Sequence, residues 1–113
     1  MRNIAILFVF VITALTSCNK LDIESGTPKC VENKIKSFNK TSICDNADVT
    51  EHIFQGKTVY VFNPGNTCGA DMTSEVIDSE CNSLGYLGGD SGNTTINGEK
   101  FSNATFVKII WKK

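Results

Sequence analysis

Several residue types are scarce in this chain, and their scarcity excludes classes of function. The chain has one histidine, His52, and no arginine after Arg2. Its ten lysines are scattered, with no cluster beyond Lys112-Lys113, and acidic residues slightly outnumber them. Sequence-independent binding to nucleic acid needs clustered cations that release counterions. We therefore expect no nucleic-acid partner.

The cysteines lack the spacing of a metal site. Cys30, Cys44, Cys68 and Cys81 are separated by 14, 24 and 13 positions, so no Cys-x-x-Cys pair exists. The lone His52 adds little to a ligand set that normally needs four cysteine or histidine donors. We expect neither a metal nor another cofactor.

No apolar run is long enough to cross a bilayer, which takes about 20 residues. The longest run begins at Ile4, after Arg2, and fades by Leu15 without a stop-transfer pattern. A short apolar stretch behind a single cation is typical of a secretory signal peptide. We assign residues 1–17 to it.

The end of this signal, Leu15-Thr16-Ser17-Cys18, resembles the bacterial lipobox, in which the cysteine receives a lipid. The resemblance implies that Cys18 becomes the first residue and is acylated, for example with palmitate, on its sulfur-linked glycerol and its amino group. Two or more acyl chains hold a protein stably on a membrane. We expect a lipoprotein of the bacterial cell envelope, on the periplasmic or surface face of the outer membrane.

Removal of residues 1–17 from the 113 leaves 96, enough for one small domain. Residues 18–28 are polar, contain Gly26 and Pro28, and have no apolar period, so we interpret them as a flexible tether. Residues 29–113 then form the folded domain.

The domain begins with a helical pattern and continues with strand patterns. Cys30, Val31, Lys34, Ile35 and Phe38 recur at helical spacing. Runs rich in β-branched and aromatic residues predict strands at Val49–Gln55, Lys57–Asn63, Thr73–Asp78 and Ala104–Trp111. The predicted fold class is α+β: one short N-terminal helix packed on an antiparallel sheet of about four strands, whose other face stays open.

Four cysteines remain once Cys18 carries lipid, and an even number in a small exported domain predicts two disulfides. The expected strand directions favour Cys30–Cys81 and Cys44–Cys68. A Cys68–Cys81 bond would have to join opposite ends of a strand about 17–20 Å long, beyond disulfide reach. A loop over residues 39–48 that ran back beside the helix would instead allow Cys30–Cys44.

The stretch Gly88-Gly89-Asp90-Ser91-Gly92 contains the GDSG of trypsin-like proteases, and His52, Asp71 and Ser91 follow the trypsin order. A serine protease needs a base, an orienting carboxylate and an oxyanion hole, which trypsin-like enzymes build between two β-barrels. The 96 residues cannot supply both barrels, and the sequence around His52 differs from theirs. We interpret the stretch as a glycine-rich turn, Ser91 as no nucleophile, and the protein as no enzyme.

Two further patterns are candidate binding sites. Asp90, Asn93, Asn97 and Glu99 offer oxygen ligands, but the EF-hand order is broken at Gly92, so a polar loop is favoured over calcium. The alternating aromatic and aliphatic residues form two sets, one for each sheet face. The sets are Tyr60 and Phe62 against Val59 and Val61, and Val107, Ile109 and Trp111 against Phe106, Lys108 and Ile110. The side chains on the open face either form a binding surface or leave that face with scattered apolar patches and no ligand.

A cysteine at the start of a short helix, the segment GKTVYVF, the later cysteines, Gly-Gly-x-x-Gly and a terminal Ile-Ile-Trp together resemble a family of small Bacteroidota lipoproteins. The similarity covers residues 28–113, and the family is a domain of unknown function. It implies an exported, disulfide-containing α+β domain and carries no activity or site residue. Many members have adjacent cysteines where this chain has only Cys68.

We therefore expect a membrane-anchored binding or accessory module for an unknown protein or envelope ligand. The alternatives are a small envelope hydrolase and a purely structural envelope lipoprotein.

Overall fold

The structure is a computed structural model that describes residues 21–65 and 72–113. The expected signal peptide, the lipidation site Cys18, Cys68 and Asp71 lie outside the described residues. The structure therefore bears on the domain but not on the expected membrane anchor.

The described chain forms one α-helix, one short 3-10 helix and seven strands. In order they are α1 (Lys29–Thr41), β1 (Asp48–Phe54), β2 (Lys57–Asn63), β3 (Thr73–Asp78), β4 (Ser83–Gly88), β5 (Thr95–Ile96), β6 (Glu99–Lys100), η1 (Phe101–Asn103) and β7 (Thr105–Lys112). Five strands make one antiparallel sheet in the order β4-β3-β2-β1-β7, and β5 and β6 form a separate hairpin. The architecture is α+β, with one strand more than expected in the main sheet.

Helix α1 begins at Lys29 because Pro28 precedes it at a φ of −55°, and proline has no N–H group that would need a partner there. Val31 and Ile35 bury one face of the helix. At its end the side chain of Lys113 donates to the carbonyls of Asn39 and Ser42. Asn39 lies in the last turn and Ser42 directly follows it, where helix carbonyls lack partners, so the two chain segments stabilise each other.

The strand that the sequence did not reveal is β4, SLGYLG, which contains no β-branched residue. Its Gly85 has a φ of +146°, and a Cβ atom there would lie 3.0 Å from Cδ1 of Ile96 in β5. Glycine within a strand often marks such a close approach. Gly85, which weakens the strand pattern in the sequence, is thus the residue that lets β5 pack on β4.

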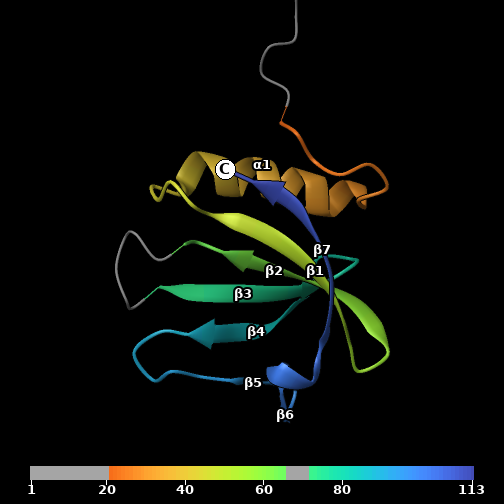
Figure 1. Ribbon diagram of the computed structural model, residues 1–113, viewed down its shortest axis with the longest axis vertical. Coiled ribbons are helices and arrows are strands. Elements are labelled where there is room, and N and C mark those ends of the chain that lie inside the picture. The colour runs from red at the N-terminus through yellow and green to blue at the C-terminus, as the bar shows by residue number, and fades with distance from the viewer. Residues whose placement is uncertain (1–20, 66–71) are drawn as a thin grey trace, which may run out of the picture.

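The face of the sheet away from α1 is covered where it was expected to be open. Because β7 pairs with β1, at the opposite edge from β4, the chain between them must cross the sheet. Since α1 occupies one face, the segment containing β5, β6 and η1 lies on the other, as Figure 1 shows. It completes a second core of Phe54, Val59, Val61, Val76 and Ile96, flanked by Leu84, Leu87, Phe101 and Ala104.

The first core lies between α1 and the sheet. It contains Val31, Ile35, Ala47, Val49, Tyr60, Phe62, Ile77, Ile110 and Trp111, flanked by Leu21, Ile23, Cys30, Phe38 and Cys81. The aromatic residues of β2 and the single tryptophan are therefore core residues, and Val59 and Val61 belong to the second core.

Strand β7 does not alternate as its sequence predicts. Register shifts interrupt its pairing with β1 between Val49 and Thr50 and between Glu51 and His52. A β-bulge adds one residue to a strand and so reverses the side-chain alternation beyond it. As a result Ile110 and Trp111 are both buried, whereas Ile109 is exposed. The predicted grouping of Ile109 with Trp111 is wrong.

Cys30 and Cys81 form a disulfide with Cα atoms 6.2 Å apart, joining the first turn of α1 to the turn between β3 and β4. This is the pair that the strand directions favoured. The fold was expected to contain two disulfides, and that expectation is not borne out within residues 21–65 and 72–113, where Cys30–Cys81 is the one bond that joins two described cysteines. Cys44 is buried, and the cysteine expected beside it, Cys68, is not among the described residues.

The residues just before α1 contact the domain. Leu21 and Ile23 pack against the first core. The Glu24 amide donates to the carbonyl of Ile110 in β7 over 2.9 Å, and the Thr27 hydroxyl donates to the carbonyl of Glu24 over 2.7 Å. From Leu21 onward the chain therefore lies on the domain surface. Across residues 21–65 and 72–113, no helix has both the length and the apolar character needed to span a membrane.

Candidate binding groove

A groove of about 210 Å³ lies between α1 and strands β2, β3 and β4. Its lining residues are Lys34, Ser37, Phe38, Thr41, Phe62, Thr73, Glu75 and Tyr86. The rings of Phe38 and Phe62 meet edge to face, with centroids 5.3 Å apart. Hydroxyl groups and one ion pair surround these apolar rings, so the groove is amphipathic.

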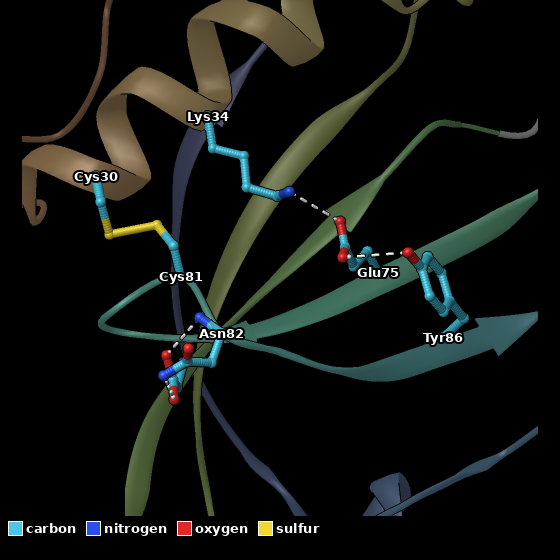
Figure 2. A network of polar contacts seen from close by, with 7 residues as sticks. Cys30, Lys34, Glu75, Cys81, Asn82 and Tyr86 are labelled. Atoms are coloured by element: carbon cyan, nitrogen blue, oxygen red, sulfur yellow. Dashed lines mark hydrogen bonds and ion pairs between the residues drawn. A yellow bond between two sulfur atoms is a disulfide. The ribbon is translucent and has the colours of Figure 1, made fainter.

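The ion pair and one further hydrogen bond link three elements, as Figure 2 shows. Lys34 of α1 extends to Glu75 of β3, with Nζ 3.0 Å from Oε1. The Tyr86 hydroxyl of β4 donates to Oε2 of the same carboxylate over 3.2 Å. Lys34 Nζ also lies 5.8 Å from the ring centre of Phe62, within the range of a cation–π interaction.

These donors fix the charge of Glu75. Partial burial by itself would raise the pKa of this carboxyl, but hydrogen bonds from Ser83, Lys34 and Tyr86 and the charge of Lys34 outweigh it, and the pKa lies below its ordinary value. Hydrogen bonds to the ionised form have this effect generally. Glu75 is therefore a carboxylate at neutral pH with its oxygens occupied, which suits it to hold the groove walls together and not to abstract protons.

The turn beside the groove is held by Asp78. Its Oδ1 accepts from the amides of Glu80 and Asn82, both over 2.9 Å, and its Oδ2 accepts from the Asn82 side chain over 3.0 Å. Burial works against these bonds, but they leave the pKa of Asp78 below its usual value. The turn carries Cys81 at a φ of +69°, so the disulfide ties α1 to a turn that is itself fixed. In Figure 2 the disulfide and the Lys34–Glu75 pair both bridge α1 and the sheet.

The groove is suited to binding a small group. Ligand pockets for drug-sized molecules occupy about 300–1,000 Å³, so 210 Å³ leaves room for little more than one side chain or a small headgroup. Tyr86 remains 52 % exposed at the rim. A bound group could stack on the aromatic rings and reach the hydroxyls of Ser37, Thr41 and Thr73.

His52 lies elsewhere, on the face of the sheet away from α1. Its Nε2 is 2.9 Å from the Thr50 hydroxyl, and its ring contacts Phe101 and Phe106 edge to face, at 5.3 and 5.6 Å. Burial lowers the pKa of His52, so the ring is neutral at pH 7 and packed between aromatic neighbours.

A polar row continues from His52 across the sheet. The Asn63 amide donates to Asp48 over 2.8 Å and to Thr50 over 3.4 Å, and Ser74 donates to Asn63 over 3.1 Å. The row joins β1, β2 and β3. It satisfies polar groups on this side of the sheet, and His52 has no role in the groove.

The GDSG segment forms a tight turn after β4. Gly88, Gly89 and Gly92 all have positive φ angles, and the Gly92 amide donates to the Gly89 carbonyl over 3.0 Å. Ser91 is exposed in this turn, and the partner of His52 is Thr50. The predicted structural turn is confirmed, while Asp71 lies outside the described residues.

Three of the four residues considered as calcium ligands, Asn93, Asn97 and Glu99, bond to other groups. Asn97 and Glu99 both contact the Gln55 side chain, and Glu99 also accepts from Asn103. Asn93 bonds the carbonyls of Tyr86 and Thr95. In the described part of the chain, no three His, Cys, Asp or Glu side chains gather as a metal site would require.

Sequence reasoning missed the groove because the three side chains that bond to one another there come from three separate elements. The sequence shows Lys34 as a member of the helical stripe and does not show its partner, Glu75. Glu75 and Tyr86 are directly paired across β3 and β4, and that pairing becomes visible only once β4 is recognised as a strand.

The family model described as Domain of unknown function (DUF6970) matches residues 33–113. The match begins inside α1, includes every strand and contains all the residues that line the groove. No curated protein and no solved structure matches the chain. Since the match spans well over half of the 113 residues, the chain belongs to the DUF6970 family, whose function is unknown.

Proposed function

We propose that this protein is an exported lipoprotein of the bacterial cell envelope, of Bacteroidota type, whose domain is a binding or accessory module without chemistry of its own. The support for export and anchoring is the short apolar run that ends in Leu15-Thr16-Ser17-Cys18. Membrane attachment through lipid on Cys18 places the domain at the envelope, on the periplasmic or surface face of the outer membrane.

The observation that carries the binding role is the groove between α1 and the sheet. Its charged groups are paired with each other, its aromatic rings line it, and the Tyr86 hydroxyl stands at its rim. Covalent catalysis instead needs a nucleophile activated by a nearby base, and no histidine lines the groove beside the hydroxyls of Ser37, Thr41 and Thr73. We propose that the groove receives one side chain of an envelope protein.

The partner chemistry follows from the groove lining. An aromatic or aliphatic side chain would pack on Phe38 and on the exposed ring of Tyr86, and a polar tip would reach Ser37 or Thr73. A buried anchor residue in a well-packed pocket commonly contributes most of the affinity of an interface. The partner is therefore a protein that presents such an anchor, and the walls fixed by Cys30–Cys81 reduce the entropy lost on binding.

Filling the groove tests this proposal. Ser37→Trp places an indole over the rings of the groove, whereas Ser102→Trp adds the same side chain to the exposed surface of η1. Native envelope proteins would be captured on the full-length protein and quantified by mass spectrometry. We expect a partner that is lost with Ser37→Trp and retained with Ser102→Trp. Equal capture by both variants would refute the groove as the binding site.

Acylation is tested separately. Replacement of Cys18 by Ser should abolish labelling by a fatty-acid probe and release the protein from the membrane fraction. Unchanged labelling and retention would refute the anchor and leave the groove proposal standing.

A further inference from the structure

The outer surface of α1 is basic. Lys29, Asn33, Lys36 and Lys40 recur at intervals of four, three and four residues and are all exposed, so they share one side of the helix. The neighbouring acid is Glu32, 3.7 Å from the Lys29 amine.

An exposed apolar side chain follows this lysine stripe. Ile43 is 84 % exposed, the highest value for a large apolar side chain among the described residues. It comes two residues after the end of α1, beside Ser42, whose carbonyl binds Lys113. Lys112 and Lys113 are exposed as well. The acidic residue that follows Ile43 most closely in the sequence is Asp45. Lysines near a membrane surface are attracted to anionic lipid headgroups, and an aliphatic side chain beside them adds apolar area that favours insertion into the interface.

The chain also enters the domain on this side. Leu21 and Ile23 pack on the core that contains Val31 and Trp111, and Glu24 bonds to β7. Only residues 19 and 20 separate Cys18 from Leu21. Three residue steps of at most about 3.6 Å each span roughly 11 Å. A lipid on Cys18 would thus hold the domain within about one Debye length, roughly 8–10 Å, of the lipid headgroups.

From these observations, and resting on the proposed acylation of Cys18, we propose that the outer surface of α1 lies on the bilayer. Lys29, Lys36 and Lys40 face anionic phospholipid headgroups, and Ile43 enters the interface. Figure 1 shows α1 on one side of the sheet and the β5–β6 hairpin on the other. The hairpin then points away from the membrane, and the groove opens beside the bilayer surface, where the partner must present its anchor.

Quenching of tryptophan by brominated lipids tests this orientation. The native chain has one tryptophan, Trp111, which is buried and supplies the baseline. The full mature lipoprotein carrying Ile43→Trp would be reconstituted in phosphatidylcholine vesicles with and without phosphatidylglycerol. The matched control is Ile53→Trp, at a side chain 40 % exposed near the β1–β2 turn. We expect at least twofold stronger quenching for Ile43→Trp than for Ile53→Trp, and a further increase with phosphatidylglycerol.

The lysines are tested in the same assay. Adding Lys36→Ser and Lys40→Ser to the Ile43→Trp variant should remove the increase caused by phosphatidylglycerol. Lys57→Ser and Lys100→Ser, also at exposed positions, should leave it unchanged.

The outcomes separate the two proposals. If the protein is acylated at Cys18 but the Ile43→Trp and Ile53→Trp variants are quenched equally, the orientation is wrong and the anchor stands. If Cys18 carries no lipid, the anchor is wrong and the orientation falls with it. If the two lysine pairs change the phosphatidylglycerol-dependent quenching equally, the proposed contact of the α1 lysines with anionic headgroups is wrong.

Discussion

Two glycines with similar backbone angles have different surroundings. Gly56, in the β1–β2 turn, has a φ of +75° and open space where a Cβ atom would lie. Gly65 has a φ of +95°, and a Cβ atom there would overlap Oδ1 of Asn46 and lie 3.1 Å from the backbone carbonyl carbon of that residue. The first glycine is required by conformation alone, whereas the second is required by conformation and by space.

This difference gives a matched pair of variants. Gly56→Ala should lower the free energy of unfolding by about 1–2 kcal/mol, the usual cost of a left-handed conformation for other residues. Gly65→Ala should cost about 1–3 kcal/mol more, because the added methyl group forces its neighbours to move. Urea unfolding of both variants measures the difference, and equal losses would contradict the close contact with Asn46.

Single elements were predictable where the local pattern agreed with the fold. The β-branched and aromatic residues of β2 located it from Lys57 to Asn63, as observed. The bulges of β7 depend on its pairing with β1, whose residues lie about 60 positions earlier in the chain. A local sequence pattern therefore cannot predict them. Strand β4 was not predicted for a related reason. A glycine at position 85 is explained by the close approach of Ile96, which belongs to another strand.

The link between α1, β3 and β4 through Glu75 gives a second prediction. Glu75→Gln removes the charge that pairs with Lys34 and should lower stability by about 1 kcal/mol, since the pair is partly exposed. Thr73→Gln, an exposed change on the same strand, serves as the control. Thermal and urea unfolding at pH 7 compare the variants, and a neutral Glu75→Gln would show that the pair does not stabilise the groove.

The same link has a defined pH dependence. Because the pKa of Glu75 is lowered in the folded protein, its stabilisation is fully present above its unfolded value of 4.5 and is lost as the pH falls through the folded value. Asp78 acts in the same direction. Acid unfolding of Glu75→Gln should therefore show a shallower loss of stability below pH 4.5 than the native protein. Parallel curves would contradict this assignment.

At the scale of the whole molecule, the disulfide closes a loop of 51 residues that contains β1, β2 and β3. Loop closure of this length restricts the unfolded chain by up to about 4 kcal/mol, and measured effects are commonly 2–4 kcal/mol. Replacing both Cys30 and Cys81 by Ala should lower the free energy of unfolding by that amount. Calorimetry of the native protein and the double variant, both without reductant, measures the difference, and equal transition temperatures would contradict the stabilisation.

The candidate site could be predicted only in part. Lys34 belongs to a helical stripe that the sequence displays, and the strand that carries Glu75 was located correctly. Their meeting depends on how α1 crosses the sheet, and Tyr86 joins them through the register of an unrecognised strand. The second core was hidden for a similar reason, because only the strand order shows that the chain must cross the far face.

The bulges of β7 have a consequence for solubility. This strand lies at a sheet edge and exposes Phe106, Val107 and Ile109, a composition that would favour pairing with the edge of another molecule and growth of aggregates. The bulges bend the edge, Lys108 places a charge on it, and the Glu24 amide occupies the carbonyl of Ile110. A regular β7 would present a straight template for pairing to neighbouring molecules, and the irregular strand presents a poorer one.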